Sequence, residues 1–275
     1  MRLLRGIPLA LQFLTVMPVK ITGPVSPQDI SSSSIFFPLV GAFQGLLLSA
    51  CPLLLLSRFS ADTAGAMVVL LYILSNGGFH FDGLSDTFDA LSVKSTGNRT
   101  SDREKRLKVM KDSTTGSIGV VSLCLALLLK YVLIREIIIY SAYFNAYLIL
   151  FLMPVLSKWT MVVAMYRAAG ARKDGLGMMF LENTKMRHLV LATLVTFVLG
   201  FGAFPVTSLS APGPFLSGLR LFTPFLLSGM AILAFFTRFL TGIFTRTFGG
   251  LTGDSFGAVH EISEIIFLVI ACLWK

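Results

Sequence analysis

Long apolar stretches are the feature that most limits how this chain can fold. About seven stretches approach 20 residues, the length that a helix needs to cross about 30 Å of hydrocarbon. They lie near residues 34–56, 63–80, 117–134, 136–156, 188–208, 219–242 and 257–274. Only 13% of residues are charged, against about 25% in soluble chains. We therefore expect an all-α, polytopic membrane bundle of about seven transmembrane helices, forming a single domain over residues 1–275.

Two parts of this expected bundle are unusual. The second stretch is interrupted by Asn76, Gly77 and Gly78, which makes it the weakest candidate span. Residues 1–20 have a basic start and an apolar middle, as signal peptides do, but no small-residue cleavage site precedes Pro18. We expect an uncleaved amphipathic helix that lies at the membrane interface.

The distribution of basic residues predicts the orientation of the chain. If the N-terminus is cytoplasmic and seven spans alternate, then loops 81–116, 157–187 and 243–256 share the inner face and carry most of the 23 Lys and Arg residues. This agrees with the positive-inside rule and predicts a multi-pass protein of the plasma (inner) membrane. Topology and anionic lipid headgroups then explain the net charge of +9, so we expect no nucleic-acid partner.

The segment GGFHFDGLSDTFDAL, residues 77–91, places three aspartates at the end of an apolar run. In a helix that begins near Asp82, Asp86 lies about 40° and Asp89 about 20° from it, so the three carboxylates share one stripe. Their mutual repulsion would be relieved by a cation, and hard oxygen ligands suit Mg²⁺ or Mn²⁺. His80 lies about 160° from the stripe and reaches it only if the glycines bend the chain. The alternative is a solvated helix end.

A second segment, MKDSTTGSIGVV at residues 110–121, precedes an apolar run. Asp112 or Ser113 can cap the following helix, and the free N–H groups at such a helix start favour an anion. Lys111 could meet a phosphate and Asp112 could share a metal ion. The alternative is an ordinary cap beside a basic membrane anchor. In the polar stretch before it, Ser101 is the expected cap of a short helix, with Glu104 completing a capping box.

A third segment, GGLTGDSFGAVHEISE at residues 249–264, leads from glycines into the last apolar run. The glycines permit close backbone approach to a ligand, but no Lys follows them, so this is not a phosphate-binding P-loop. Asp254 and Glu261 lie on nearly one face. Buried acids here are equally consistent with an ion pathway. Asp174 is a further acid of interest, because its basic neighbours could attract an anionic ligand, but a surface loop explains them as easily.

Together these segments resemble one known family. ALQFLTVMPV, GGFHFDGLSDTFDAL, MKDSTTGSIGV, DGLGMMF and GGLTGDSFGAVHEISE occur in the order found in cobalamin synthase, adenosylcobinamide-GDP ribazoletransferase. The resemblance implies an Mg²⁺-dependent membrane enzyme that joins adenosylcobinamide-GDP to α-ribazole, or its 5′-phosphate, and releases GMP. Phe79 and Phe81 replace common leucines, Ser85 a common alanine and Ala90 a common glycine. Only Ala90 bears on backbone geometry.

The resemblance also assigns roles to residues. The expected metal ligands are Asp82, Asp86, Asp89 and Asp112. The expected catalytic residues are His80, Asp89 and Lys111, and the sequence does not choose between Asp89 and His80 as the base. The expected substrate-binding residues are Ser113, Gly116, Gly250 and Asp254. The sequence is also compatible with a homo-oligomer.

Two other functions remain as alternatives. An enzyme similar to CDP-alcohol phosphotransferases would also carry aspartates on membrane helices, but the run D-x-x-D-G-x-x-A-R of that class is absent. A cation transporter would use Asp89, Asp254, Glu261 and Glu264 as a relay, because ionisable groups at membrane depth are often functional. Transport would continue without a nucleotide substrate, whereas the transferase would not turn over.

Overall fold

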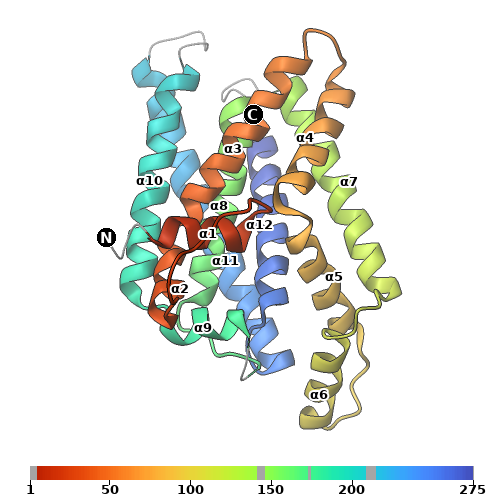
Figure 1. Ribbon diagram of the computed structural model, residues 1–275. Coiled ribbons are helices and arrows are strands. Elements are labelled where there is room, and N and C mark those ends of the chain that lie inside the picture. The colour runs from red at the N-terminus through yellow and green to blue at the C-terminus, as the bar shows by residue number, and fades with distance from the viewer. Residues whose placement is uncertain (1–4, 141–145, 173–174, 209–214, 275) are drawn as a thin grey trace.

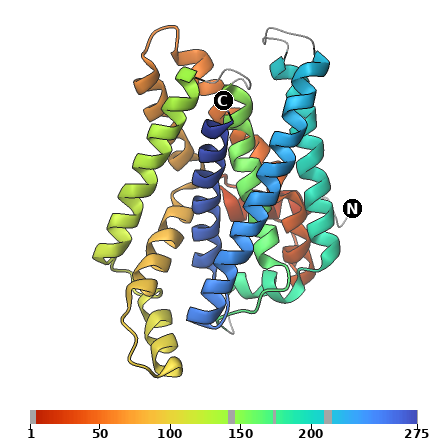
Figure 2. The ribbon, with the colours of Figure 1, turned by 180° about the vertical axis from the view of Figure 1, so that it is seen from behind.

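The computed structural model describes residues 5–140, 146–172, 175–208 and 215–274. Within these ranges the chain is a helical bundle (Figures 1 and 2), and its only β-pairing is an isolated bridge between Gly170 and Leu251. The expected all-α fold is confirmed. Asp174 and residues 209–214 lie outside the described residues.

The described chain consists mainly of helices, which follow in this order along the sequence. They are α1 (Gly6–Leu14), α2 (Pro27–Ser33), η2 (Ser34–Phe36), α3 (Phe37–Leu55), α4 (Ala61–Asn76), α5 (Phe79–Ser92), α6 (Arg99–Val109), α7 (Ser117–Tyr140), α8 (Ala146–Met165), α9 (Leu176–Asn183), α10 (Met186–Ser208), α11 (Phe215–Phe248) and α12 (Gly253–Leu273).

Six helical segments of the described chain are long and apolar enough to cross a membrane, and the bent pair α4–α5 makes a seventh candidate. The expected count is therefore confirmed. The predicted boundary between the third and fourth spans was wrong, because α7 runs past Arg135 to Tyr140. The Arg135 side chain forms an ion pair with Asp62 of α4, so the charge is accommodated within the helix and does not end it.

The α4–α5 pair is bent by 89° at the predicted interruption. Gly77 and Gly78 have φ angles of 66° and 74°, in the left-handed region that glycine adopts without steric cost. The side chain of Asn76 accepts the Gly78 N–H at 2.9 Å and fixes the turn. The acidic segment is therefore a separate short helix that starts inside the bundle.

Helix α8 forms the centre of the bundle, and every residue of its apolar window is buried. Helix α3 approaches it closely at Gly41 and Gly45, where an added Cβ would meet the backbone of Pro154 or Phe151. Such contact between small residues is the common way for membrane helices to pack. It leaves the opposite side of α8 free to pack against α12.

Three connections meet at one end of the bundle, the lower end in Figure 1, where α6 and α9 lie. Arg103 of α6 donates a hydrogen bond to the Ala171 carbonyl at 3.0 Å, and the Leu251 N–H donates to the Ala169 carbonyl at 2.8 Å. The prediction that loops 81–116, 157–187 and 243–256 lie together is confirmed. Asn98 caps α6 by accepting the N–H groups of Thr100 and Ser101, so the expected Ser101 cap was wrong by one turn.

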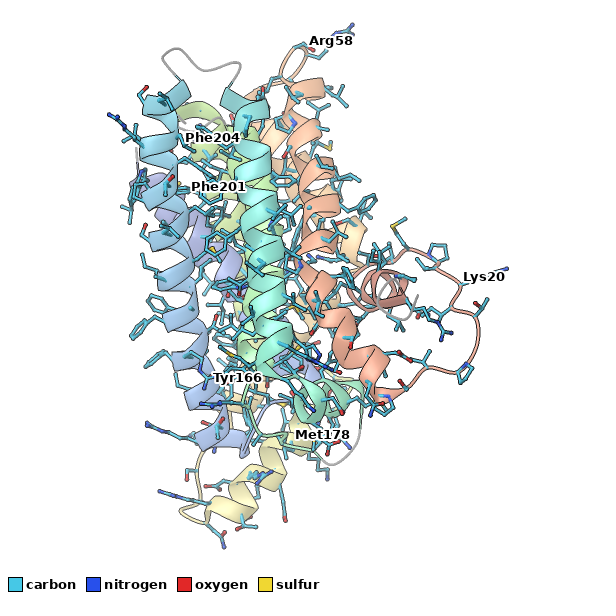
Figure 3. All side chains as sticks on the ribbon, turned by 90° about the vertical axis from the view of Figure 1, so that its left-hand side faces the viewer. Lys20, Arg58, Tyr166, Met178, Phe201 and Phe204 are labelled. Carbon is cyan, nitrogen blue, oxygen red and sulfur yellow. The ribbon has the colours of Figure 1, made fainter. Side chains whose placement is uncertain are left out.

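The N-terminal segment packs against the flank of the bundle. Figure 3 shows the chain around Lys20, between α1 and α2, projecting from that flank. Residues 5–20 of the expected amphipathic helix are described, and the helix α1 covers only Gly6–Leu14 of them, so the expected helix was too long at its C-terminal end. Gly6, Ala10 and Leu14 of α1 are buried. These three residues recur every four positions, so they form one stripe that faces protein.

Candidate functional site

The site forms where α5 crosses α12. A Cβ added to Gly83 would lie 2.7 Å from the Asp254 carbonyl oxygen, and one added to Gly257 would lie 2.9 Å from that of His80. The backbone of α12 thus fills the space beside Gly83. This close approach brings residue 254 to the predicted aspartate stripe, although the two are far apart in sequence.

Three carboxylates gather at this crossing. Asp82 is exposed and Asp86 is half-buried on α5, and Asp254 is partly buried in the first turn of α12. The charges of Asp82 and Asp254 both act on Asp86, so the expected crowding of negative charge is present. The stripe therefore presents two acids of α5, with Asp254 added from α12.

Asp89 of the stripe has a different environment. Its carboxylate is buried and accepts the backbone N–H groups of Gly116 and Gly119, both at 2.7 Å. Asp89 therefore caps the start of α7, which has free N–H groups like any helix start. The expected cap by Asp112 or Ser113 was wrong, because a residue from another helix supplies the acceptor.

Asp112 makes a local turn on the surface. Its Oδ1 accepts the hydroxyl of Thr114 at 2.7 Å and the Thr114 N–H at 3.0 Å. These hydrogen bonds hold the pKa of Asp112 below its ordinary value, so the group is ionised at neutral pH. Lys111 and Ser113 are also exposed on this loop. All three stay predictions as ligands of a metal ion or substrate.

The two predicted glycines of the site face protein. The N–H of Gly116 is used by Asp89. A Cβ at Gly250 would lie 2.5 Å from the Ala169 carbonyl oxygen, so Gly250 permits close contact with the loop that follows α8. Their assignment to substrate binding stays a prediction that these contacts do not test.

Arg172 belongs to the site and was not singled out from the sequence. Its Nη2 lies 3.4 Å from Oδ2 of Asp254, and its Nε and Nη2 have no hydrogen-bond partner among the described residues. It lines a cavity of about 180 Å³ together with Thr252 and Asp254. The basic residues of ARKDGLGMMF were the only signal, and spacing alone does not separate them from an ordinary surface loop.

His80 lies in the first turn of α5 and is buried against α12. Its ring stacks on that of His260, with centroids 4.0 Å apart. Its Nε2 has no hydrogen-bond partner within the described chain. Because the bend at Gly77 and Gly78 lets α5 begin at Phe79, His80 belongs to this helix, and its ring lies beside the crossing.

Glu261 and Glu264 point into a different, fully buried cluster. The ammonium group of Lys130 on α7 bonds both carboxylates, and the Tyr72 hydroxyl also donates to Glu261. With His260, these two acids are the only three described side chains of metal-binding type that lie close enough to share an ion. Lys130 already supplies the compensating charge.

The acids at the crossing suit a magnesium ion that also binds substrate phosphates and waters. Mg²⁺ is commonly held by one or two carboxylates together with substrate phosphates and waters. Asp82 and Asp86, with Asp254 across from them, offer oxygen ligands of this kind. No nearby soft ligand favours zinc, since His80 is turned toward His260. The chemistry of these carboxylates therefore suits Mg²⁺ held by one or two of them, although the three do not lie close enough together in this structure to share one ion.

Comparison with known proteins identifies the family of this chain. The family model for cobalamin-5-phosphate synthase matches residues 6–272. Adenosylcobinamide-GDP ribazoletransferase of Thermodesulfovibrio yellowstonii is 33% identical over 262 residues, covering 95% of this chain and 93% of the relative. The protein of the same name from Syntrophobacter fumaroxidans is 36% identical over 271 residues, covering 96% and 97%. No solved structure matches the chain.

The matched range runs from α1 to the last turn of α12 and therefore spans the α5–α12 crossing. The chain belongs to the cobalamin-5-phosphate synthase family.

Proposed function

We propose that this protein transfers the adenosylcobinamide-phosphate group of adenosylcobinamide-GDP to a sugar hydroxyl of α-ribazole, or of α-ribazole 5′-phosphate, and releases GMP. The relatives that match over nearly the whole chain bear the name of this activity. The observation that carries the proposal is the meeting of Asp82, Asp86 and Asp254 at the α5–α12 crossing, beside Arg172.

The reaction exchanges one phosphorus–oxygen bond for another. A free hydroxyl oxygen of the ribazole sugar bonds to the phosphorus attached to cobinamide and gives its proton to a base, the bond to the bridging oxygen of the diphosphate breaks, and GMP leaves with that oxygen. Such transfers depend mainly on positioning and on neutralising the charge of the phosphates. The site needs an anion-binding group, a group that accepts the hydroxyl proton, and ligands for a divalent cation.

The residues at the crossing can fill these roles. Asp82 and Asp86 would hold Mg²⁺, with Asp254 near them; Asp89 and Asp112 remain further candidate ligands. When bound, the ion supplies positive charge that stabilises the diphosphate and the leaving phosphate. Arg172 has unused N–H groups for phosphate oxygens, and charge-assisted hydrogen bonds of this type are strong. Lys111 is the second candidate for a phosphate contact.

His80 is the better-placed acceptor for the hydroxyl proton. Asp89 already accepts two backbone N–H groups, so protonating it would weaken the cap of α7. The Nε2 of His80 has no partner among the described residues. General base catalysis requires a group within hydrogen-bond reach of the hydroxyl, and His80 lines the cavity next to Asp254.

The two alternative functions have less support. The family match opposes a CDP-alcohol phosphotransferase. In a transporter, Glu261 and Glu264 would have to be free to exchange cations, whereas both bind Lys130. Neither alternative accounts for the arginine beside Asp254.

The test is GMP release by purified, detergent-solubilised protein with adenosylcobinamide-GDP and α-ribazole. We expect release to require both substrates, to stop with EDTA, to return with Mg²⁺, and to be matched by corrinoid product. Well-folded protein that releases no GMP under these conditions would overturn the proposal. CDP-alcohol substrates and ion flux in liposomes would then be tested.

The site is proposed to face the cytoplasm from the plasma (inner) membrane, where nucleotide substrates are available. A Lys111→Cys variant should react with an impermeant maleimide only in inverted vesicles, and Ser60→Cys, in the loop before α4, only in intact spheroplasts. The opposite labelling pattern would invert the proposed orientation.

A further inference from the structure

A cavity of about 730 Å³ opens beside the α5–α12 crossing, and most of its lining is apolar, unlike that of the acidic site. Pockets that enclose drug-sized ligands are typically about 300–1,000 Å³. Most of its wall is apolar and includes four aromatic rings. The rings are contributed by Phe13 of α1, Phe79 of α5, Phe180 of α9 and Phe256 of α12.

The cavity has a polar end at the site of reaction. Asp254 and His80 are part of its lining. Asp254 and Gly253 also line the smaller cavity of about 180 Å³ that contains Arg172. The two cavities therefore meet at the first turn of α12. The larger one is mainly apolar, and the smaller one contains the guanidinium group of Arg172.

The aromatic wall is held in place by its own packing. The ring of Phe13 stacks near Phe37 with centroids 5.8 Å apart, and it contacts Phe180 at 4.8 Å. Helix α2, whose Ile30 and Ser33 also line the cavity, is fixed by a capping box between Ser26 and Asp29. A ligand would meet a preformed surface, which reduces the entropic cost of binding.

We propose that this cavity binds the planar base of the acceptor nucleoside, α-ribazole, against its aromatic rings, with the sugar hydroxyls toward Asp254 and His80. This inference rests on the proposed reaction and adds the place of one substrate. In this arrangement, the Arg172 cavity receives the phosphates of the donor, and the two reacting groups meet where the cavities join.

Size and charge select the acceptor over the donor. A corrinoid that carries an adenosyl group is far larger than a nucleoside and does not fit within 730 Å³. A guanosine diphosphate is polyanionic, and the described residues that line this cavity include no Lys or Arg to compensate its charge. A neutral benzimidazole riboside matches the lining, because aromatic side chains stack on planar bases and its polar sugar reaches the carboxylate end.

Two substitutions test the location. Gly253 lines both cavities, and a Cβ added there has no heavy atom within 4 Å, so Gly253→Leu fills open space without an internal clash. Phe79 is 56% exposed, so Phe79→Ala removes part of the cavity wall at little cost to folding. Phe239→Ala on α11 is the matched control, because Phe239 is 55% exposed and is not part of the cavity.

The measurements are equilibrium dialysis of labelled α-ribazole, with and without adenosylcobinamide-GDP in EDTA, and the KM for each substrate. We expect each site variant to weaken α-ribazole binding about tenfold or more, as loss of one base-stacking ring or obstruction of an apolar pocket typically does. The KM for adenosylcobinamide-GDP should change less than twofold in Phe79→Ala, whereas Gly253→Leu should raise both KM values because Gly253 also lines the Arg172 cavity. Phe239→Ala should match the wild type. If Gly253→Leu does not fold, Phe79→Ala carries the test.

Three results would overturn the location: unchanged α-ribazole affinity in both folded variants, a rise confined to the KM for adenosylcobinamide-GDP, or no α-ribazole binding by the wild type. The first would point to a lipid chain as the occupant, and the second to the corrinoid. If the wild type binds α-ribazole and the variants weaken this binding as expected, but no GMP is released with Mg²⁺, then the proposed reaction is wrong and the proposed α-ribazole site is retained.

Discussion

Asp89 of α5 accepts the backbone N–H of Gly119 of α7 at 2.7 Å, and this contact joins two helices through the open end of one of them. The second carboxylate oxygen accepts the N–H of Gly116 at the same distance. One member of the aspartate stripe is thus committed to helix packing. Asp82 and Asp86 remain available to a ligand.

Replacing Asp89 by Asn should therefore lower the stability of the protein. An amide has one oxygen, so its NH₂ group would face a backbone N–H of α7. Loss of a hydrogen bond to a charged group costs about 1.5–3 kcal/mol, and we expect a reduction of that size in the free energy of unfolding. Thermal or SDS unfolding in detergent measures it. A stable Asp89→Asn protein that has lost GMP release would instead make Asp89 a catalytic residue.

Asp86→Asn should have the opposite profile. Because the substitution removes a charge repelled by Asp82 and Asp254, the free energy of unfolding should stay the same or rise. GMP release should fall about 10²–10³-fold, the usual effect of losing one electrostatic contact in a transition state. Asp62→Asn is the matched control, because Asp62 is exposed on α4 and its ion pair contributes little. Full activity of Asp86→Asn would remove it from the metal-binding set.

Gly119→Ala should disturb the same α5–α7 contact from the other side. The added Cβ would collide with the Asp89 carboxylate and the Ser85 hydroxyl, and overpacking typically costs about 1–3 kcal/mol. Gly242→Ala in α11 is the control, because its Cβ has no heavy atom within 4 Å, and it should gain up to about 1 kcal/mol in helix propensity. Equal stability of the two variants would contradict the close α5–α7 contact.

Arg172→Lys tests the phosphate contact. Lys keeps the charge but loses the planar pair of N–H donors, so we expect the KM for adenosylcobinamide-GDP to rise about tenfold or more while the KM for α-ribazole changes little. Steady-state GMP release measures both constants. Lys105→Ala, an exposed substitution on α6, should leave both unchanged. A rise confined to α-ribazole would assign Arg172 to the acceptor.

Lys130→Met should destabilise the bundle strongly. It removes the cation that bonds both Glu261 and Glu264, so the buried Lys158, which lies beside His260, then faces two carboxylates, and removing one partner of a buried pair costs about 3–5 kcal/mol. Adding Glu261→Gln to the same chain should recover most of the loss, because Lys158 and Glu264 then leave one cation and one anion in the cluster. Unfolding of the single and double variants measures the coupling. No recovery would show that Lys130 acts through packing alone.

The sequence predicted those features that depend on local periodicity. The apolar stretches gave nearly all the membrane helices, the stripe of Asp82 and Asp86 lies on one helix face, and Gly77 and Gly78 break the chain as expected. The predicted end of a span at Arg135 failed because its partner, Asp62, comes from another helix.

The missing parts of the site depend on contacts between distant segments. Asp89 caps a helix that begins 28 residues later in the chain, and no local pattern distinguishes such a cap from a metal ligand. Arg172 acquires its role only from Asp254, which the α5–α12 crossing brings to the stripe. The aromatic cavity likewise requires α1 to fold back on the bundle.

The buried cluster around Lys130 also affects how the protein is made. Lys130 lies within α7, while its partners Glu261 and Glu264 are on the last helix, 131 and 134 residues later. A charged side chain near the centre of a lone span costs about 2.5–3.5 kcal/mol. During synthesis α7 therefore carries an unmatched charge until α12 emerges from the ribosome. A nascent chain that stops short of α12 lacks the acids that neutralise this core, so truncated products are natural substrates for membrane quality control.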